Sequence, residues 1–218
     1  MVVRLCDALD IPLRARNELL VAAGYASIYP EKALDLEEMQ AVREALNRIV
    51  AHHEPYPAFV IDRRWRVVMM NEGAQRMVSA CLDAASVKAL SPDGALNFMR
   101  MMFEPRGLRS RIRNWAHVEP RLLSGLKREA AGDSTSPSAA LLGEFAPIAD
   151  CRAPYDEDFE PLAPTVPVEI SVDGAVVRLF NTITTFGTPQ DVGLQELRIE
   201  LTFPADEETD LALRALRA

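Results

Sequence analysis

The hydrophobic period changes twice along this chain of 218 residues, and the order of the changes restricts the fold more than any other feature. The segment AFVIDRRWRVVMMN holds two short apolar runs about a polar turn at 62–64, which predicts a β-hairpin. Helical periodicity then extends from about Ala95 to Pro147. Three strand-like runs follow, with the sequences VPVEISV, AVVRLFNTITTF and LQELRIELTFP. Two strands separated from three others by helices predict an α+β fold with a five-stranded antiparallel sheet.

Turn and cap residues agree with this order of elements. Asn71 follows the first hairpin and is placed to cap the next helix by accepting from its free N–H groups. Asp173 and Gly174 separate the next two strands and are typical of a two-residue hairpin turn. A doubly wound parallel fold would alternate strand and helix one by one, and this alternation is absent. The layout is that of PAS-like sensor domains.

The chain begins with two short apolar helices in MVVRLCDALDIPLRARNELLVAAGYA, the second of which ends at Gly24. Two such helices cannot form a core by themselves. An amphipathic helix follows in LEEMQAVREALNRIVAHH, with an apolar stripe from Leu36 to Val50. Pro55 and Pro57 end this helix, which we interpret as a connector.

Composition favours a soluble cytoplasmic protein, because the chain has no apolar run of membrane-spanning length and no secretory signal. We therefore expect no membrane contact. The three cysteines, Cys6, Cys81 and Cys151, are widely spaced and form no C-x-x-C pair, which argues against disulfides and a zinc site. Residues 133–218 hold 5 basic against 16 acidic side chains, so most of this half would repel a nucleic-acid backbone.

Catalytic and metal-binding patterns are missing from the sequence. His52 and His53 are adjacent on a predicted helix and so point in different directions, and His117 is the third histidine. We predict no enzyme activity, no cofactor and no metal. An enzyme on this sheet remains the less favoured alternative, and it would need Tyr155, Glu169 and His117 within hydrogen-bond reach of one another.

Methionines mark the candidate binding site. The segment NFMRMMFEP places several of them on one short helix, where their flexible side chains suit the irregular shape of a bound apolar molecule. Ordinary core packing is the alternative interpretation of the same helix, and the sequence leaves both open. From strand and helix phase we predict these ligand-binding residues: Phe59, Ile61, Met69, Met99, Met102, Phe103, Trp115, Phe180 and Phe186.

The succession LCDALDIPLRARNELLVAAGYA, EPYPAFVIDRRWRVVMMN, LNFMRMMFEP and IRNW resembles the MmyB-like class of bacterial helix-turn-helix transcription regulators of the XRE family. The resemblance runs from Met1 to about Arg128, and beyond it only the layout is similar. It implies a five-helix DNA-binding domain followed by a PAS-like domain that senses a small apolar molecule, for example a fatty-acid-like one. The first two helices would then be the last two of the five, so that DNA is contacted only through helices absent from this sequence.

These observations predict three parts of the chain: residues 1–27 as a remnant of the helix-turn-helix domain, 28–54 as a connector, and 55–218 as the PAS-like ligand-binding domain. The expected function is ligand sensing that modulates DNA binding of the full-length regulator. The alternative is a dimerisation or interaction module without a small ligand. We expect a homodimer under both hypotheses, because regulators of this type bind paired half-sites.

Overall fold

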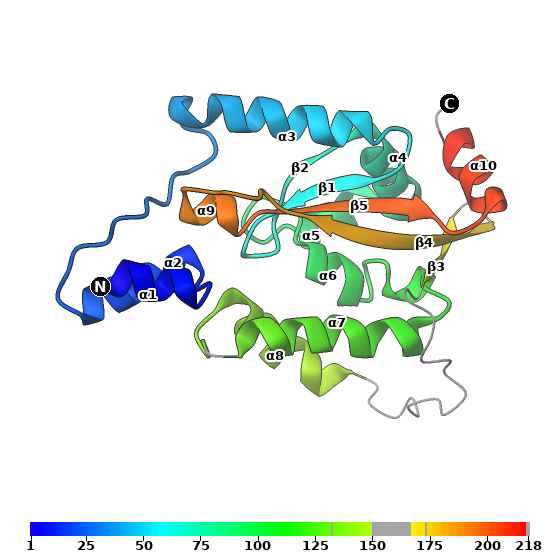
Figure 1. Cartoon of the computed structure of the whole chain (residues 1–218). Coiled ribbons are helices and arrows are strands. Elements are labelled where there is room, and N and C mark those ends of the chain that lie inside the picture. Colours follow the sequence, from blue (N-terminus) through cyan, green and yellow to red (C-terminus); the bar gives the residue numbers. More distant parts are fainter. Residues whose placement is uncertain (132, 150–166, 173, 217–218) are drawn as a thin grey trace.

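The computed structural model describes residues 1–131, 133–149, 167–172 and 174–216. Its centre is one antiparallel sheet with the strand order β2-β1-β5-β4-β3, which confirms the predicted α+β fold and five-stranded sheet (Figure 1). The central strand β5 pairs with β1 on one side and with β4 on the other. The strands are β1 (Ala58–Ile61), β2 (Val67–Met70), β3 (Val168–Val172), β4 (Ala175–Thr184) and β5 (Arg198–Pro204).

One face of the sheet is covered by α3 (Gln40–His52), which follows the short 3-10 helix η1 (Glu37–Met39) (Figure 1). Leu46 and Val50 of α3 are buried against Ala58 and Val60 of β1, together with Ile199 of β5. The helix that we interpreted as a connector is therefore also a layer of the sheet domain.

The opposite face packs against a group of helices that lies between β2 and β3 in the sequence. Asn71 begins this group as predicted, since its Oδ1 accepts from the backbone N–H of Ala74 at 2.9 Å. The same oxygen also accepts from Ala58 at 2.9 Å, which joins the start of α4 to the start of β1. The group comprises α4 (Glu72–Cys81), α5 (Ala84–Ala89), α6 (Phe98–Phe103), η2 (Arg109–Arg111), α7 (Trp115–Ala130), α8 (Pro137–Phe145) and η3 (Ala146–Ile148).

The remaining helices lie at the ends of the sheet. The C-terminal α10 (Glu207–Ala215) packs beside β4 and β5, and α9 (Val192–Gln195) lies in the connection between those two strands. The N-terminal helices α1 (Val2–Ala8) and α2 (Leu13–Ala22) contact each other, and α2 contacts α9 (Figure 1). Gly24 follows α2 with a φ of +81°, as expected for a glycine that ends a helix.

Some sequence expectations fall outside the described residues, namely those on Cys151, Tyr155 and Asp173. Cys6 and Cys81 are both buried. Within the part of the chain that the structure describes, no helix has both the length and the apolar character that crossing a membrane requires.

Candidate ligand-binding site

A cavity of about 270 Å³ lies between the inner face of the sheet and helices α4, α6 and α7. Its apolar lining includes the rings of Phe59 on β1 and Phe98 on α6, which meet edge to face with centroids 5.7 Å apart. Further apolar side chains line the wall: Trp65, Met77, Val78, Met99, Met101, Met102, Leu108, Val118, Leu122, Val168, Ile170, Leu179 and Ile183.

Helix α6 forms the methionine-rich wall of this cavity. It begins after Asn97, whose Oδ1 accepts from the N–H of Arg100 at 3.0 Å and whose Nδ2 donates to the carbonyl of Arg64 at 3.0 Å. Arg100, the only charged residue of α6, donates to both carboxylate oxygens of Glu144 on α8, at 2.6 and 2.7 Å. These polar contacts fix the position of α6, while its methionine side chains keep several rotatable bonds on the cavity side.

Polar side chains of β5 also face the cavity, which the sequence did not reveal. Arg198, Glu200 and Thr202 line it, whereas the intervening Ile199 and Leu201 pack on the α3 side. The alternation was visible in the sequence, but its polar phase would ordinarily be assigned to solvent. Here α3 covers the apolar side chains of β5, and the polar side chains of the same strand face the cavity.

Glu200 is the most buried acidic group of the lining, with 6 % of its surface exposed. Its Oε2 accepts a hydrogen bond of 3.0 Å from Nδ2 of Asn181 on β4. Burial raises the pKa of the Glu200 carboxyl to about 7, although the Asn181 hydrogen bond acts in the opposite direction. Near neutral pH both the protonated and the ionised form of this carboxyl are therefore populated.

Arg198 closes one end of the cavity by joining β5 to α7. Its guanidinium donates to both carboxylate oxygens of Glu129, at 2.8 and 3.0 Å, and lies 4.1 Å from the ring centroid of Trp65. Ser138 completes the arrangement, because its hydroxyl accepts from Trp65 Nε1 at 3.0 Å and donates to Glu129 at 2.7 Å. The last turn of α7 is thus held to the sheet by charge as well as by packing.

The cavity reaches solvent between α7 and the end of β4. The lining residues Arg121 and Arg128 on α7 are exposed, as are Asn181 and Ile183 on β4. Gly125 lies between the two arginines, and a side chain added there would meet no atom within 4 Å of its Cβ. A molecule entering the cavity would pass this rim.

The structure brings three of the nine predicted binding residues into the lining: Phe59, Met99 and Met102. Ile61 and Phe103 belong to the same core but lie outside the lining. Phe103 stacks instead on Phe145 of α8, with ring centroids 4.6 Å apart.

The other four predicted residues also lie outside the lining. Trp115 starts α7 and donates from Nε1 to Glu119 at 3.1 Å. Met69 and Phe186 pack against the core under α3, and Phe180 stacks on Phe203 with centroids 5.3 Å apart. Both faces of this sheet bury apolar side chains, so hydrophobicity alone could not tell which phase of a strand faced the cavity.

The family model of the MmyB-like transcription regulator ligand binding domain matches residues 42–216, from α3 to the C-terminal helix. The chain belongs to this family. Every residue that lines the cavity lies within the matched range of the MmyB-like domain. No curated protein matches the chain.

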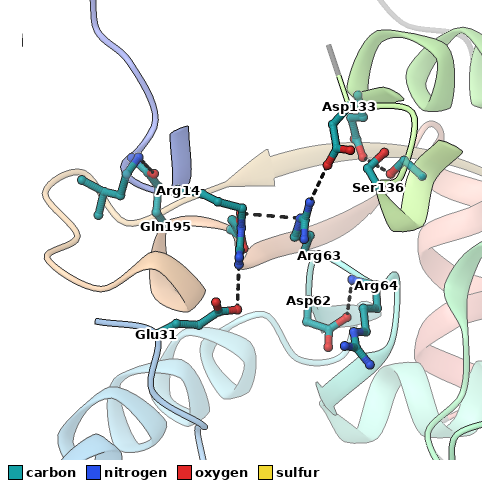
Figure 2. A network of polar contacts seen from close by, with 12 residues as sticks. Arg14, Glu31, Asp62, Arg63, Arg64, Asp133, Ser136 and Gln195 are labelled. Carbon is teal, nitrogen blue, oxygen red and sulfur yellow. Dashed lines mark hydrogen bonds and ion pairs between the residues drawn. The ribbon is translucent and has the colours of Figure 1, made fainter. Parts of the chain in front are cut away.

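A polar network connects this MmyB-like domain to α2, which precedes the matched range (Figure 2). Arg14 of α2 donates to both carboxylate oxygens of Glu196, at 2.7 and 2.8 Å, and to Glu31 at 2.6 Å. The backbone N–H of Leu13 donates to the side chain of Gln195 at 2.6 Å. Helix α2 is thereby attached to the segment that leads from α9 into β5.

A second branch of the network reaches the end of α7. Arg63, in the turn between β1 and β2, donates to Asp133 at 3.1 Å, and its Nε lies 3.7 Å from Glu196 (Figure 2). Asp133 lies between α7 and α8. Glu196 therefore contacts both the N-terminal helix and the turn that holds the loop after α7.

The histidines and acidic residues of the described chain form no cluster that could bind a metal ion. His53 is used structurally, since its Nε2 lies 2.7 Å from the carbonyl oxygen of Thr202. The family is described as a ligand-binding domain of regulators, which is a binding function.

Proposed function

We propose that the chain is the ligand-sensing part of a helix-turn-helix transcription regulator of the XRE family. In this proposal a small, mainly apolar molecule occupies the cavity between the sheet, α6 and α7 and changes DNA binding by the full-length protein. The observation that carries the proposal is the methionine-lined cavity inside the ligand-binding domain, open between α7 and β4. The expected compartment is the cytoplasm.

The size and lining of the cavity define the expected ligand. Small-molecule sites usually enclose about 300–1,000 Å³, and this cavity lies just below that range. An apolar chain such as that of a fatty-acid-like molecule would gain about 25 cal/mol for each Å² removed from water. Met99 and Met102 can adjust their side-chain rotamers to the shape of that chain.

The route from the cavity to the N-terminal helices is short. Helix α7 is one wall of the cavity, and its Glu129 holds Arg198 of β5. Glu196, two positions before Arg198, accepts a hydrogen bond from Arg14 of α2. A ligand that binds one position of α7 more tightly than another shifts the population between them, and β5 transmits that difference to the contact with α2.

We further propose that α1 and α2 are the last two helices of the DNA-binding domain. Large apolar side chains are exposed in both helices, Leu5 in α1 and Leu19 and Val21 in α2, and Leu9 directly after α1 is exposed as well. Such side chains are suited to packing against the other helices of a helix-turn-helix domain. DNA would be contacted by those other helices.

Native mass spectrometry of the purified chain, followed by solvent extraction, tests ligand binding. We expect a bound small molecule near unit stoichiometry in the wild type. Gly125→Phe places a ring at the rim and should abolish binding of this molecule. Gly143→Phe, on the exposed face of α8 and outside the lining, should leave the molecule bound. Wild type without a bound molecule, and without stabilisation by any added alkyl compound, would contradict the proposal.

The second candidate is a dimerisation module without a small ligand. It is favoured by the exposed apolar side chains of α1 and α2, which a second copy of the chain could cover. The same mass spectra report the assembly mass. A dimer that carries no small molecule and is unchanged by Gly125→Phe would support this candidate.

A further inference from the structure

A buried carboxyl group inside an apolar ligand cavity needs a reason. Glu200 of β5 has 6 % of its surface exposed and lines the cavity beside Phe59 and the methionines of α6. Replacing it by an apolar residue would avoid the cost of burying a charge. The polar group is therefore informative about what the cavity binds.

Glu200 lines the cavity, and only one of its two carboxylate oxygens accepts a hydrogen bond from a described residue. Its Oε2 accepts from Asn181, but within the described residues no hydrogen bond reaches Oε1. The nearby Arg198 donates to both oxygens of Glu129 and contacts Trp65 instead. Within the described residues Oε1 is not one of the fully enclosed polar atoms without a partner, so this oxygen stays accessible and a ligand in the cavity could donate to it.

We propose that Glu200 selects a ligand whose apolar body carries a hydrogen-bond donor, an amine or a hydroxyl, and discriminates against a carboxylate. This inference rests on the proposed ligand-binding function and adds the chemical class of the ligand: the alkyl chain is that of a fatty-acid-like molecule, but its polar end is an amine or a hydroxyl in place of the carboxylate. The donor would reach Oε1 from the cavity, while Asn181 keeps Oε2 engaged.

The charges around the site explain the expected preference. From α7, Glu129 is already paired with Arg198 of β5, and the exposed Arg121 and Arg128 lie at the rim. An ammonium group at Oε1 compensates the charge of ionised Glu200 in a site that is shielded from water. A carboxylate there would place a second acceptor and a second negative charge against Glu200.

Binding of three probes with the same alkyl chain to the full chain tests this inference. We expect decylamine and decanol to bind wild type about ten-fold or more tightly than decanoate at pH 7, as titration calorimetry measures. Glu200→Gln should remove most of the advantage of decylamine and change decanol binding less, because glutamine keeps an acceptor oxygen. Glu169→Gln on β3, outside the lining, is the control variant.

A second measurement needs no variant. Decylamine stays positively charged between pH 8 and pH 5, but Glu200 becomes protonated in that interval, so its affinity for wild type should fall about ten-fold while that of decanol stays nearly constant. Decanoate binding most tightly in wild type and Glu200→Gln alike would place the polar end at the rim arginines and overturn this inference, but not ligand binding itself. Failure of all three probes to bind would overturn both.

Discussion

Arg14 and Glu196 are 182 positions apart in the sequence, yet the guanidinium of one holds both carboxylate oxygens of the other, at 2.7 and 2.8 Å. The pair joins a helix outside the matched family range to the segment that enters the central strand. Hydrogen bonds to Glu196 and to Glu31 raise the pKa of Arg14 further above its ordinary value, so the guanidinium stays charged. Arg14 is therefore a permanent cation at the attachment of α2.

Removal of this pair should loosen the N-terminal helices. Arg14→Ala is expected to speed amide hydrogen exchange in α1 and α2, because the side chains of both partners are more than two-thirds buried and hold α2 in place. The expected loss is about 1 kcal/mol in the local opening free energy. Lys32→Ala removes an exposed ion pair with Glu38 and is the control. Equal exchange rates in Arg14→Ala and wild type would show that other contacts hold these helices.

Glu200 should make the stability of the fold decrease with rising pH. Its pKa is raised in the folded state, so between about pH 4.5 and pH 7 the folded chain binds more protons than the unfolded chain, and its stability falls as the group ionises. Above pH 7 the group is ionised in the folded chain, and its burial lowers the free energy of unfolding by on the order of 3 kcal/mol. Urea unfolding at pH 5 and pH 8 should show Glu200→Gln gaining stability relative to wild type at the higher pH. A constant difference between the two proteins would contradict this assignment.

Phe103 and Met102 should differ in how much a substitution lowers the free energy of unfolding. Phe103 is fully buried and stacks on Phe145, so Phe103→Ala should lower the free energy of unfolding by about 3–5 kcal/mol. Met102→Leu keeps the volume of a lining side chain and should cost less than about 1.5 kcal/mol. Denaturant titrations of both variants measure these costs. A small cost for Phe103→Ala would mean that the stacked rings contribute little to the core.

Gly73 should tolerate no side chain. A Cβ there would lie 2.3 Å from the backbone oxygen of Pro55, so Gly73→Ala must displace either α4 or the segment before β1. We expect a loss of about 1–3 kcal/mol, by analogy with overpacking elsewhere. Gly125→Ala in α7 meets no atom within 4 Å and should instead gain up to about 1 kcal/mol from helix propensity. Thermal unfolding of the two variants should shift in opposite directions.

Local patterns were sufficient to predict the sheet and its helices from the sequence. Apolar alternation located the strands, Asn71 marked the start of α4, and the spacing of strands and helices indicated the antiparallel sheet. Met99 and Met102 of α6, which were predicted to bind a ligand, line the cavity, and their role in binding stays a prediction.

The remainder depended on contacts between distant segments. With α3 interpreted as a connector, nothing in the sequence showed that Ile199 and Leu201 face a helix, and so nothing placed Glu200 inside. The attachment of Arg14 to Glu196 joins two polar residues at opposite ends of the chain, and no periodic pattern predicts such a pair. Polar contacts of this kind follow from the fold and do not determine it.

The central strand also limits how such a ligand-binding domain can diverge during evolution. Glu196, Arg198 and Glu200 occupy alternate positions of one short segment, so a substitution that retunes recognition is made next to the attachment of the N-terminal helices. The methionines of α6 do not have such a second role, because Asn97 and Arg100 hold that helix through their contacts with Arg64 and Glu144. In related proteins that bind a different ligand but keep the attachment of the N-terminal helices, we therefore expect the side chains of α6 to vary first and those of β5 last.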